Sequence, residues 1–228
     1  MESVKYSDRK TSFTHRIGEG EFGSVYRYDD IVIKKYFRNY ATGGHIKEDI
    51  FYTLKDINSK TFMDLIDCSI TTVESKGLDY GKKVIRAYSS KYVKKSNKKS
   101  IDMPMDYTIN SIYEMFKLIK IFNELGIRIE DTFGDNLIVT DENIVIIDPD
   151  FYSFDKRLDI MKNLEGLNRY ISELWCNEYG ISQEDEVARF NMNKFFYKES
   201  YENYMKEMCK ILNEKTPRDI IKKTLHKK

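Results

Sequence analysis

The sequence has few of the residues that stabilise small secreted proteins or build structural zinc sites. Among its 228 residues are three cysteines, three histidines and three prolines. Cys68, Cys176 and Cys209 lie far apart, and none belongs to a Cys-x-x-Cys pair. An odd number of isolated cysteines argues against a disulfide framework or a zinc centre and fits a reducing compartment. We therefore expect a cytoplasmic protein, and we assign the isolated histidines no catalytic or metal-binding role.

Long hydrophobic segments and an excess of one charge are also absent from the sequence. No apolar run approaches the roughly 20 residues that span a bilayer, and the N-terminus has no hydrophobic secretion signal. Lys and Arg number 38 against 37 for Asp and Glu, so the formal net charge is +1. Such a balance creates no global field that would attract nucleic acid or an anionic membrane. We expect neither as a partner.

The residues that are present predict a globular chain of the α+β class. The hydrophobic share of 41% is too high for a disordered chain. Alternation with period two predicts strands in the first part of the chain, with Asp29-Asp30 as a tight turn between two of them. The expected strands are 13–17, 24–28, 31–36, 69–73, 77–80 and 83–88. A helix is expected where apolar residues recur at helical spacing from Ile46 to Ile57.

The second part of the chain has a mainly helical pattern. It follows a lysine-rich stretch, residues 91–100, that we interpret as a solvated connector rather than a contact for nucleic acid. The expected elements are a helix from Ile109 to Phe122 that ends at Gly126, strands at 137–139 and 144–147, and helices from Leu158 onward. We expect a single domain, 1–228, with one part at 1–93 and a second, mostly helical part at 94–228.

Three glycines have the spacing Gly-x-Gly-x-x-Gly in the first expected hairpin. Gly18, Gly20 and Gly23 would let backbone N–H groups approach a phosphate closely. The same spacing opens dinucleotide-binding units, but a helix follows the glycines there, whereas a strand is expected here. For this segment alone, a nucleotide-binding loop and an ordinary glycine-rich hairpin are equal alternatives.

Lys34 is the candidate phosphate-binding cation on the strand after this hairpin. Val32 and Lys34 share a face of the strand because side chains alternate, and Lys35 is expected in solvent on the other face. An acid on the following helix would hold the ammonium group in place. Glu48 is the candidate, Asp49 competes with it, and a simple surface position is the alternative for both.

Two acids and an amide follow later in the chain at a characteristic spacing. Asp131 stands five residues before Asn136, and Asp148 follows after the two short strands. Glycine loop, strand lysine, helix acid and these three residues occur in one order over residues 17–150. In this order the sequence resembles the protein-kinase superfamily. The resemblance implies a two-lobed protein-kinase-like fold, with an antiparallel sheet and one helix in the N-lobe and a shortened, mostly helical C-lobe.

The resemblance also implies an activity and a set of site residues. The protein would be an ATP- and Mg²⁺-dependent phosphotransferase that transfers the γ-phosphoryl group to a hydroxyl. Asp131 and Lys34 would be catalytic, and Asn136 and Asp148 would hold Mg²⁺. The residues expected to bind ATP are Ile17, Gly18, Gly20, Gly23, Val25, Val32, Lys34 and Glu48.

The motifs also depart from the family pattern. Ile129 and Glu130 precede Asp131, where the family usually has His-Arg, and Phe133 stands where protein Ser/Thr kinases commonly have a lysine. The usual Asp-Phe-Gly becomes Asp-Pro-Asp, which adds the carboxylate of Asp150. This carboxylate either helps to bind metal or turns the chain.

The nature of the acceptor is the most open part of the prediction, because the region after Asp150 is short. We favour a protein acceptor. The alternatives are a small-molecule kinase of the aminoglycoside or choline type and a nucleotide-binding pseudokinase. The presence of all four residues needed for transfer favours an enzyme over a pseudokinase. These four are Lys34, Asp131, Asn136 and Asp148.

Overall fold

The computed structural model describes residues 15–37, 45–73, 81–99, 102–130, 136–155 and 162–163. Asp131, the strand expected at 77–80 and the first residues of the strand expected at 13–17 lie outside them, as does most of the region expected to be helical from Leu158 onward. The described residues form a mixed α+β structure with a five-stranded antiparallel sheet and two helices. The expected α+β class is therefore confirmed.

The described residues divide into two compact units. The first contains the described residues up to Asn58, together with Met63–Tyr92 and Pro149–Ser153. The second contains Ser59–Phe62, Val93–Asp148 and the described residues from Phe154 onward. The short segment 149–153 thus packs with the N-terminal part of the chain, although it is distant from it in sequence.

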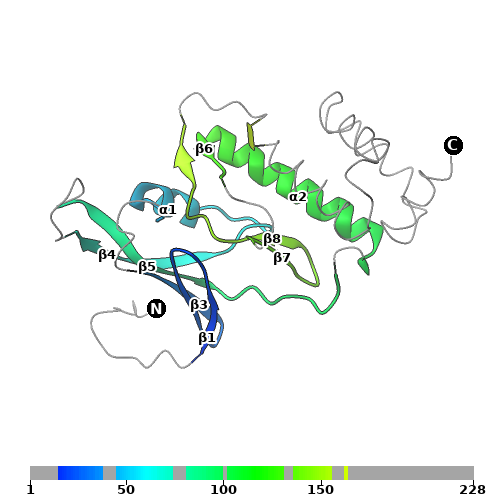
Figure 1. The fold of residues 1–228 in the computed structure, drawn as a ribbon. Coiled ribbons are helices and arrows are strands. Elements are labelled where there is room, and N and C mark those ends of the chain that lie inside the picture. The colour runs from blue at the N-terminus through cyan, green and yellow to red at the C-terminus, as the bar shows by residue number, and fades with distance from the viewer. Residues whose placement is uncertain are drawn as a thin grey trace, which may run out of the picture. The chain divides into compact units, whose positions relative to one another are not determined.

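The first unit is built on the five-stranded sheet (Figure 1). Its strands are β1 (Arg16–Glu19), β2 (Gly23–Tyr28), β3 (Ile31–Tyr36), β4 (Leu65–Thr72) and β5 (Lys83–Lys91). The spatial order is β1-β2-β3-β5-β4, so β3 is the middle strand. Asp29 has φ 51° in the two-residue turn between β2 and β3, a backbone conformation that such hairpin turns require. The predicted turn at Asp29-Asp30 is confirmed.

Helix α1 (Glu48–Lys55) packs on one face of this sheet. Its inward face consists of Ile50, Phe51 and Leu54, all buried. The Phe51 ring lies 6.2 Å from the ring of Tyr88 on β5. Because Tyr88 is paired directly with Lys34 on β3, both side chains lie on the face that α1 covers. This face carries the candidate site.

The second unit contains helix α2 (Met105–Glu124) and short strands. The strands are β6 (Ile127–Arg128), β7 (Leu137–Val139) and β8 (Ile144–Ile146), and β7 pairs with β8. Strand β6 pairs with β9 (Ser153–Phe154), whose first residue is the last of the segment 149–153. The buried residues of α2 include Ile112, Met115, Leu118, Ile119 and Phe122. Gly126 has φ 68° directly after the helix, as its predicted role in ending the helix requires.

In the connector after β5, Ser96 departs from the expected solvated loop. The lysines of the connector are exposed, but Ser96 is 6% exposed. The Ser96 N–H donates to the carbonyl of Val139 at 2.7 Å, and its hydroxyl donates to the carboxylate of Asp141 at 2.5 Å. The lysines give the segment a polar composition, whereas Ser96 attaches it to the β7–β8 hairpin.

Tyr107 provides a further link within the second unit. Its hydroxyl donates to the carbonyl of Thr140 at 2.9 Å, which joins α2 to the end of β7. Burial raises the pKa of Tyr107 to about 12, so the phenol keeps its proton and this hydrogen bond at neutral pH. Among the described helices, α2 included, none is long and apolar enough to cross a membrane.

Candidate functional site

Lys34 lies in the middle strand of the sheet and is buried. Its Cα is paired with Val25 on β2 and with Tyr88 on β5, so the three residues form a row on one face. Lys34 is 7% exposed, whereas the adjacent Lys35 is exposed, as the alternation predicts. A lysine is almost never buried to this degree without a partner, because its ammonium group loses its hydration. A buried ammonium group of this kind therefore needs an acid beside it.

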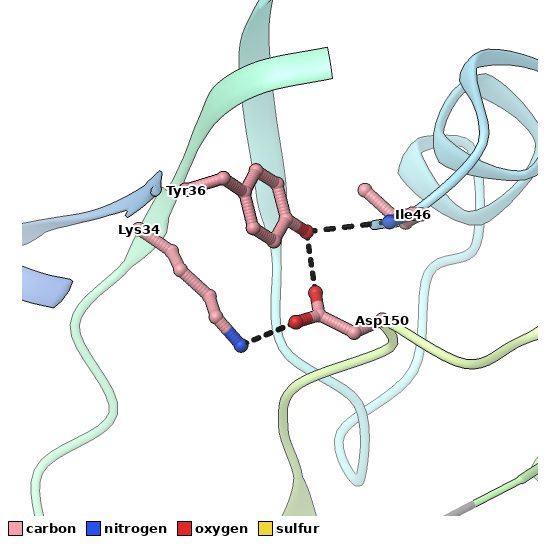
Figure 2. A network of polar contacts seen from close by, with 4 residues as sticks. All are labelled: Lys34, Tyr36, Ile46 and Asp150. Atoms are coloured by element: carbon pink, nitrogen blue, oxygen red, sulfur yellow. Dashed lines mark hydrogen bonds and ion pairs between the residues drawn. The ribbon is translucent and has the colours of Figure 1, made fainter. Parts of the chain in front are cut away.

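Asp150 is that partner. The Lys34 Nζ lies 2.6 Å from Oδ2 of Asp150, and the two side chains are 9% and 2% exposed (Figure 2). Asp150 belongs to the segment 149–153, which is part of the same compact unit as β3. The result is a charge-assisted hydrogen bond between two buried ions. In such a pair each ion supplies the compensation that the other lost with its hydration.

Tyr36 orients the carboxylate of Asp150. It follows Lys34 by two residues on the same face of β3, and its hydroxyl donates to Oδ1 of Asp150. The same hydroxyl oxygen accepts the backbone N–H of Ile46 at 3.3 Å, just before α1 (Figure 2). Both carboxylate oxygens of Asp150 are therefore hydrogen-bonded. Tyr36 links β3, the approach to α1 and Asp150 in one network.

His45 packs on the other side of this network as a neutral ring. Its ring stacks on that of Tyr36 with a centroid separation of 4.0 Å. Burial is the main cause that lowers the pKa of His45, and the nearby positive charges of Arg86 and Lys34 lower it further. The imidazole is therefore uncharged at neutral pH. His45 therefore adds no positive charge beside Lys34.

The structure gives Lys34 a different partner from the acid expected on α1. Glu48 is exposed in the first turn of the helix, and Asp49, also exposed, accepts the N–H of Ile50 at 2.8 Å with its Oδ1. The inward face of α1 is apolar, and both acids lie off it. The assignment of Glu48 as the partner of Lys34 is therefore corrected to Asp150.

The three glycines lie at the β1–β2 hairpin, as expected. Gly18 is paired with Val25, and the Gly20 N–H donates to the carbonyl of Gly23 at 2.9 Å. A Cβ added at Gly20 would meet nothing within 4 Å, and one at Gly18 would make an ordinary contact with Val25 at 3.9 Å. Neither has a left-handed φ. Packing and backbone conformation therefore do not explain why these two positions are glycine.

Gly23 is glycine because a neighbouring strand leaves no room for a side chain. A Cβ at Gly23 would lie 2.5 Å from the backbone carbonyl oxygen of Lys35 on the neighbouring strand. Because a backbone atom of a central strand cannot easily move, Gly23→Ala should lower the free energy of unfolding by about 1–3 kcal/mol. Gly20→Ala is the matched control and should change it by less than about 0.5 kcal/mol. Urea denaturation curves of the two variants measure this difference, and equal midpoints would contradict it.

The apolar residues expected around ATP lie on the first three strands. Ile17 on β1 is 51% exposed. Val25 lies opposite Lys34, and Val32 precedes Lys34 by two residues on the same face. Both valines are half-buried. Val25 and Val32 therefore place apolar surface beside the lysine.

The tip of the glycine hairpin also contacts the segment that carries Asp150. The ring of Phe22 lies 5.2 Å from that of Phe151 in an edge-to-face arrangement. The carbonyl of Phe22 accepts the N–H of Phe37 at 2.9 Å, which attaches the tip to the end of β3. The segment 149–153 is thus joined to the unit through Phe151 as well as through Asp150.

In the second unit, Asn136 and Asp148 lie at the same end of the β7–β8 ribbon. The N–H of Ile147 donates to the carbonyl of Asn136 at 2.9 Å, immediately before Asp148. Asp148 has φ 59°, which is uncommon for a residue other than glycine and more frequent for Asp and Asn than for other residues. Residues held in such sparsely populated conformations cluster at functional sites.

These two residues are suitable ligands for Mg²⁺. A carboxylate and an amide oxygen are the donors that this hard cation prefers, and beside nucleotide phosphates it takes one or two protein ligands. Within the described ranges, no group of three His, Cys, Asp or Glu side chains is arranged to hold a metal ion. A Mg²⁺ ion at Asn136 and Asp148 would therefore need further oxygen ligands.

Asp131 lies outside the described residues, but the backbone that leads to it is described. Asn163, which is 2% exposed, accepts the N–H of Ile129 at 2.9 Å with its Oδ1. Its Nδ2 donates to the carbonyl of Ile127 at 2.9 Å and to Oδ1 of Asn123 at 2.7 Å. Asn163 thus attaches the approach to Asp131 to the end of α2.

Sequence reasoning did not find Tyr36 or Asn163, and it left the role of Asp150 open. The signal for Tyr36 was its period-two spacing from Lys34, which places both on one face. Asp150 was recognisable as an additional carboxylate, but nothing in the local pattern named its partner. Asn163 has no local signal, because a single asparagine in a helical pattern is common.

No model of a protein family matches the chain, and no curated protein sequence matches it. The α+β class, the five-stranded sheet and the buried ion pair are properties of the structure.

Proposed function

We propose that this protein is an ATP- and Mg²⁺-dependent phosphotransferase with a two-lobed protein-kinase-like fold. The single observation that carries the proposal is the position of Lys34. It is a buried, ion-paired lysine on the middle strand, directly opposite Val25 on the second strand of the glycine hairpin. A structural role alone does not favour a charged residue here, because an apolar side chain would be accommodated without the cost of burying two ions.

The glycines support the same function. Gly18 and Gly20 are not required by packing or by backbone conformation. Glycine at these positions is explained if a phosphate approaches the backbone closely, because a side chain would obstruct that approach. Gly23 is required by the sheet itself, so it contributes to the proposal through the shape of the hairpin rather than through contact with the ligand.

Each residue of the proposed site has one task. Lys34 binds phosphate oxygens of ATP, and Asp131 orients the acceptor hydroxyl and accepts its proton. Asn136 and Asp148 would hold Mg²⁺, which would supply positive charge against the charge of the phosphates. A bond forms between the acceptor oxygen and the γ-phosphorus, and the bond from that phosphorus to the bridging oxygen of ADP breaks. Positioning and charge neutralisation supply most of the rate enhancement.

We favour a hydroxyl of a protein side chain as the acceptor and the cytoplasm as the place of action. The sequence lacks the extended catalytic-loop signature and the helical insertions of the small-molecule kinases that it otherwise resembles. The isolated cysteines fit a reducing compartment. Transfer to a small molecule and nucleotide binding without transfer are the competing functions.

One experiment tests these functions together. The purified protein is incubated with γ-labelled ATP and an extract of its source cells, with Mg²⁺ or with EDTA, and the protein and small-molecule fractions are separated. We expect Mg²⁺-dependent label in the protein fraction. Label in the small-molecule fraction would identify the alternative kinase class, and tight Mg·ATP binding without transfer would identify a pseudokinase. Failure to bind ATP with Mg²⁺ present would overturn the proposal.

A further inference from the structure

The counter-charge of Lys34 comes from the chain beyond the metal-binding motif and not from helix α1. Asp150 follows the proposed metal ligand Asp148 by two residues and is buried against the middle strand. The acids of α1 are exposed at its start, off the face that packs on the sheet. A buried ammonium group needs a compensating acid, and Asp150 is placed to be that acid.

We propose that Asp150 and Tyr36 are positioning residues that orient the Lys34 ammonium group toward phosphate. The resemblance to the protein-kinase superfamily implies instead that an acid on helix α1 has this role. The inference rests on the proposed function, because it assigns a purpose to the orientation of Lys34. The inference goes beyond the proposed function because it names two residues, Asp150 and Tyr36, to which the motifs assign no role.

The hydrogen bonds explain how the orientation is achieved. A lysine side chain has four rotatable methylene carbons, so its ammonium group is poorly positioned unless something fixes it. Oδ2 of Asp150 accepts from the Lys34 Nζ, and Oδ1 accepts from the hydroxyl of Tyr36. Both Lys34 and Tyr36 belong to β3, so the carboxylate is held against two points of one strand (Figure 2).

Tyr36 is itself held in place from a second element. Its hydroxyl oxygen accepts the N–H of Ile46 while its proton goes to Asp150, so it acts as donor and acceptor at once. The stacked ring of His45 restricts the Tyr36 ring as well. Asp150 therefore has a fixed orientation rather than a choice of rotamers.

A blocking role for Asp150 would use the same contacts but predicts the opposite result. A carboxylate against a phosphate-binding lysine resembles a bound anion, and a ligand would then have to displace it. The observed geometry favours a positioning role, because both carboxylate oxygens of Asp150 accept hydrogen bonds and its side chain is only 2% exposed. An ammonium group also has three N–H donors, so an ion pair with one carboxylate is compatible with a phosphate contact.

The first measurement needs no nucleotide. The rate of Lys34 acylation by an amine-directed reagent is followed by mass spectrometry in the wild type and in Asp150→Asn and Tyr36→Phe. Loss of the carboxylate removes the charge-assisted hydrogen bond that holds the Lys34 amino group, so Asp150→Asn should raise the rate by about tenfold or more, the effect of losing one hydrogen bond between charged groups. Tyr36→Phe, which removes one oxygen and keeps the ring, should raise it by a smaller factor.

A matched control separates this effect from a general loss of structure. Asp64 pairs with Lys91 on the surface of the same unit at 2.7 Å, so Asp64→Asn removes an ion pair without touching Lys34. It should leave Lys34 acylation unchanged. Amide exchange of β3 is measured in the same samples and should stay at the wild-type level. Faster Lys34 acylation that appears only together with faster β3 exchange would overturn the inference.

The second measurement is Mg·ATP affinity. Positioning predicts weaker binding, by about tenfold in Asp150→Asn and less in Tyr36→Phe, where one hydrogen bond to a charged group is lost. Tighter binding by Asp150→Asn would overturn positioning in favour of the blocking role, and unchanged acylation in both variants would overturn the pairing itself. If the acylation rates change as expected but the wild type binds no ATP, the proposed function fails and the ion pair stands.

Discussion

Replacement of Asp131 by asparagine should lower the rate of phosphoryl transfer by about 10²–10⁴-fold, the contribution of a positioned general base. The reason is that asparagine keeps the size of the side chain but cannot accept the proton of the acceptor hydroxyl. Mg·ATP affinity should stay within about twofold of the wild type, because the interaction is made in the transition state and not with bound nucleotide. Single-turnover transfer and equilibrium binding of ATP measure the two effects separately.

The neighbouring acid provides the control for this variant. Glu130 pairs with Arg128 at 2.9 Å, with both side chains more than 40% exposed. Glu130→Gln removes one carboxylate from the same stretch of chain and should leave transfer near the wild-type rate. Equal losses in both variants would show that charge in this stretch matters and Asp131 does not. Full activity of Asp131→Asn would remove Asp131 from the catalytic residues.

Replacement of Asp148 by asparagine should remove the Mg²⁺-dependent part of ATP binding. The loss of a charged metal ligand should weaken Mg²⁺ affinity by at least about 100-fold, more than the loss of a residue that merely supports a ligand. Asparagine suits this position because, like aspartate, it tolerates the φ of 59° that Asp148 adopts. Titration of Mg²⁺ at fixed ATP concentration, with EDTA as the metal-free reference, measures the effect.

Asp29 is a matched control for the Asp148 variant. It is the other non-glycine residue with positive φ in the described part of the chain, at 51°, and it lies in the β2–β3 turn. Asp29→Asn makes the same chemical change in a similar backbone conformation, so it should leave the Mg²⁺ dependence of ATP binding unaltered. Equal Mg²⁺ dependence of ATP binding in Asp148→Asn and the wild type would exclude Asp148 as a ligand.

Several elements could be predicted because their signals are local. The period-two pattern of β3 placed Lys34 on one face and Lys35 on the other, and the structure has one buried and the other exposed. Gly126 ends α2 with the left-handed φ that a glycine permits most easily. These features depend on neighbours within a few residues, which the sequence shows directly.

The glycine hairpin illustrates where local signals stop. One motif contains three glycines, and spacing alone suggests one role for all of them. In the structure, Gly23 is pressed against the backbone of β3, whereas Gly18 and Gly20 have open surroundings. The difference depends on the neighbouring strand, so no inspection of the motif could separate the two roles.

The sequence by itself determined β2 and β3, the turn between them, the helix of the second unit and the order of the chemically active residue types. Tertiary structure alone decided which acid compensates Lys34. The sequence suggested Glu48, fourteen positions away, and the structure has Asp150, which is 116 positions away. The physical reason is that periodicity reports which face of an element a residue occupies, whereas a buried ion pair depends on which distant segment packs against that face.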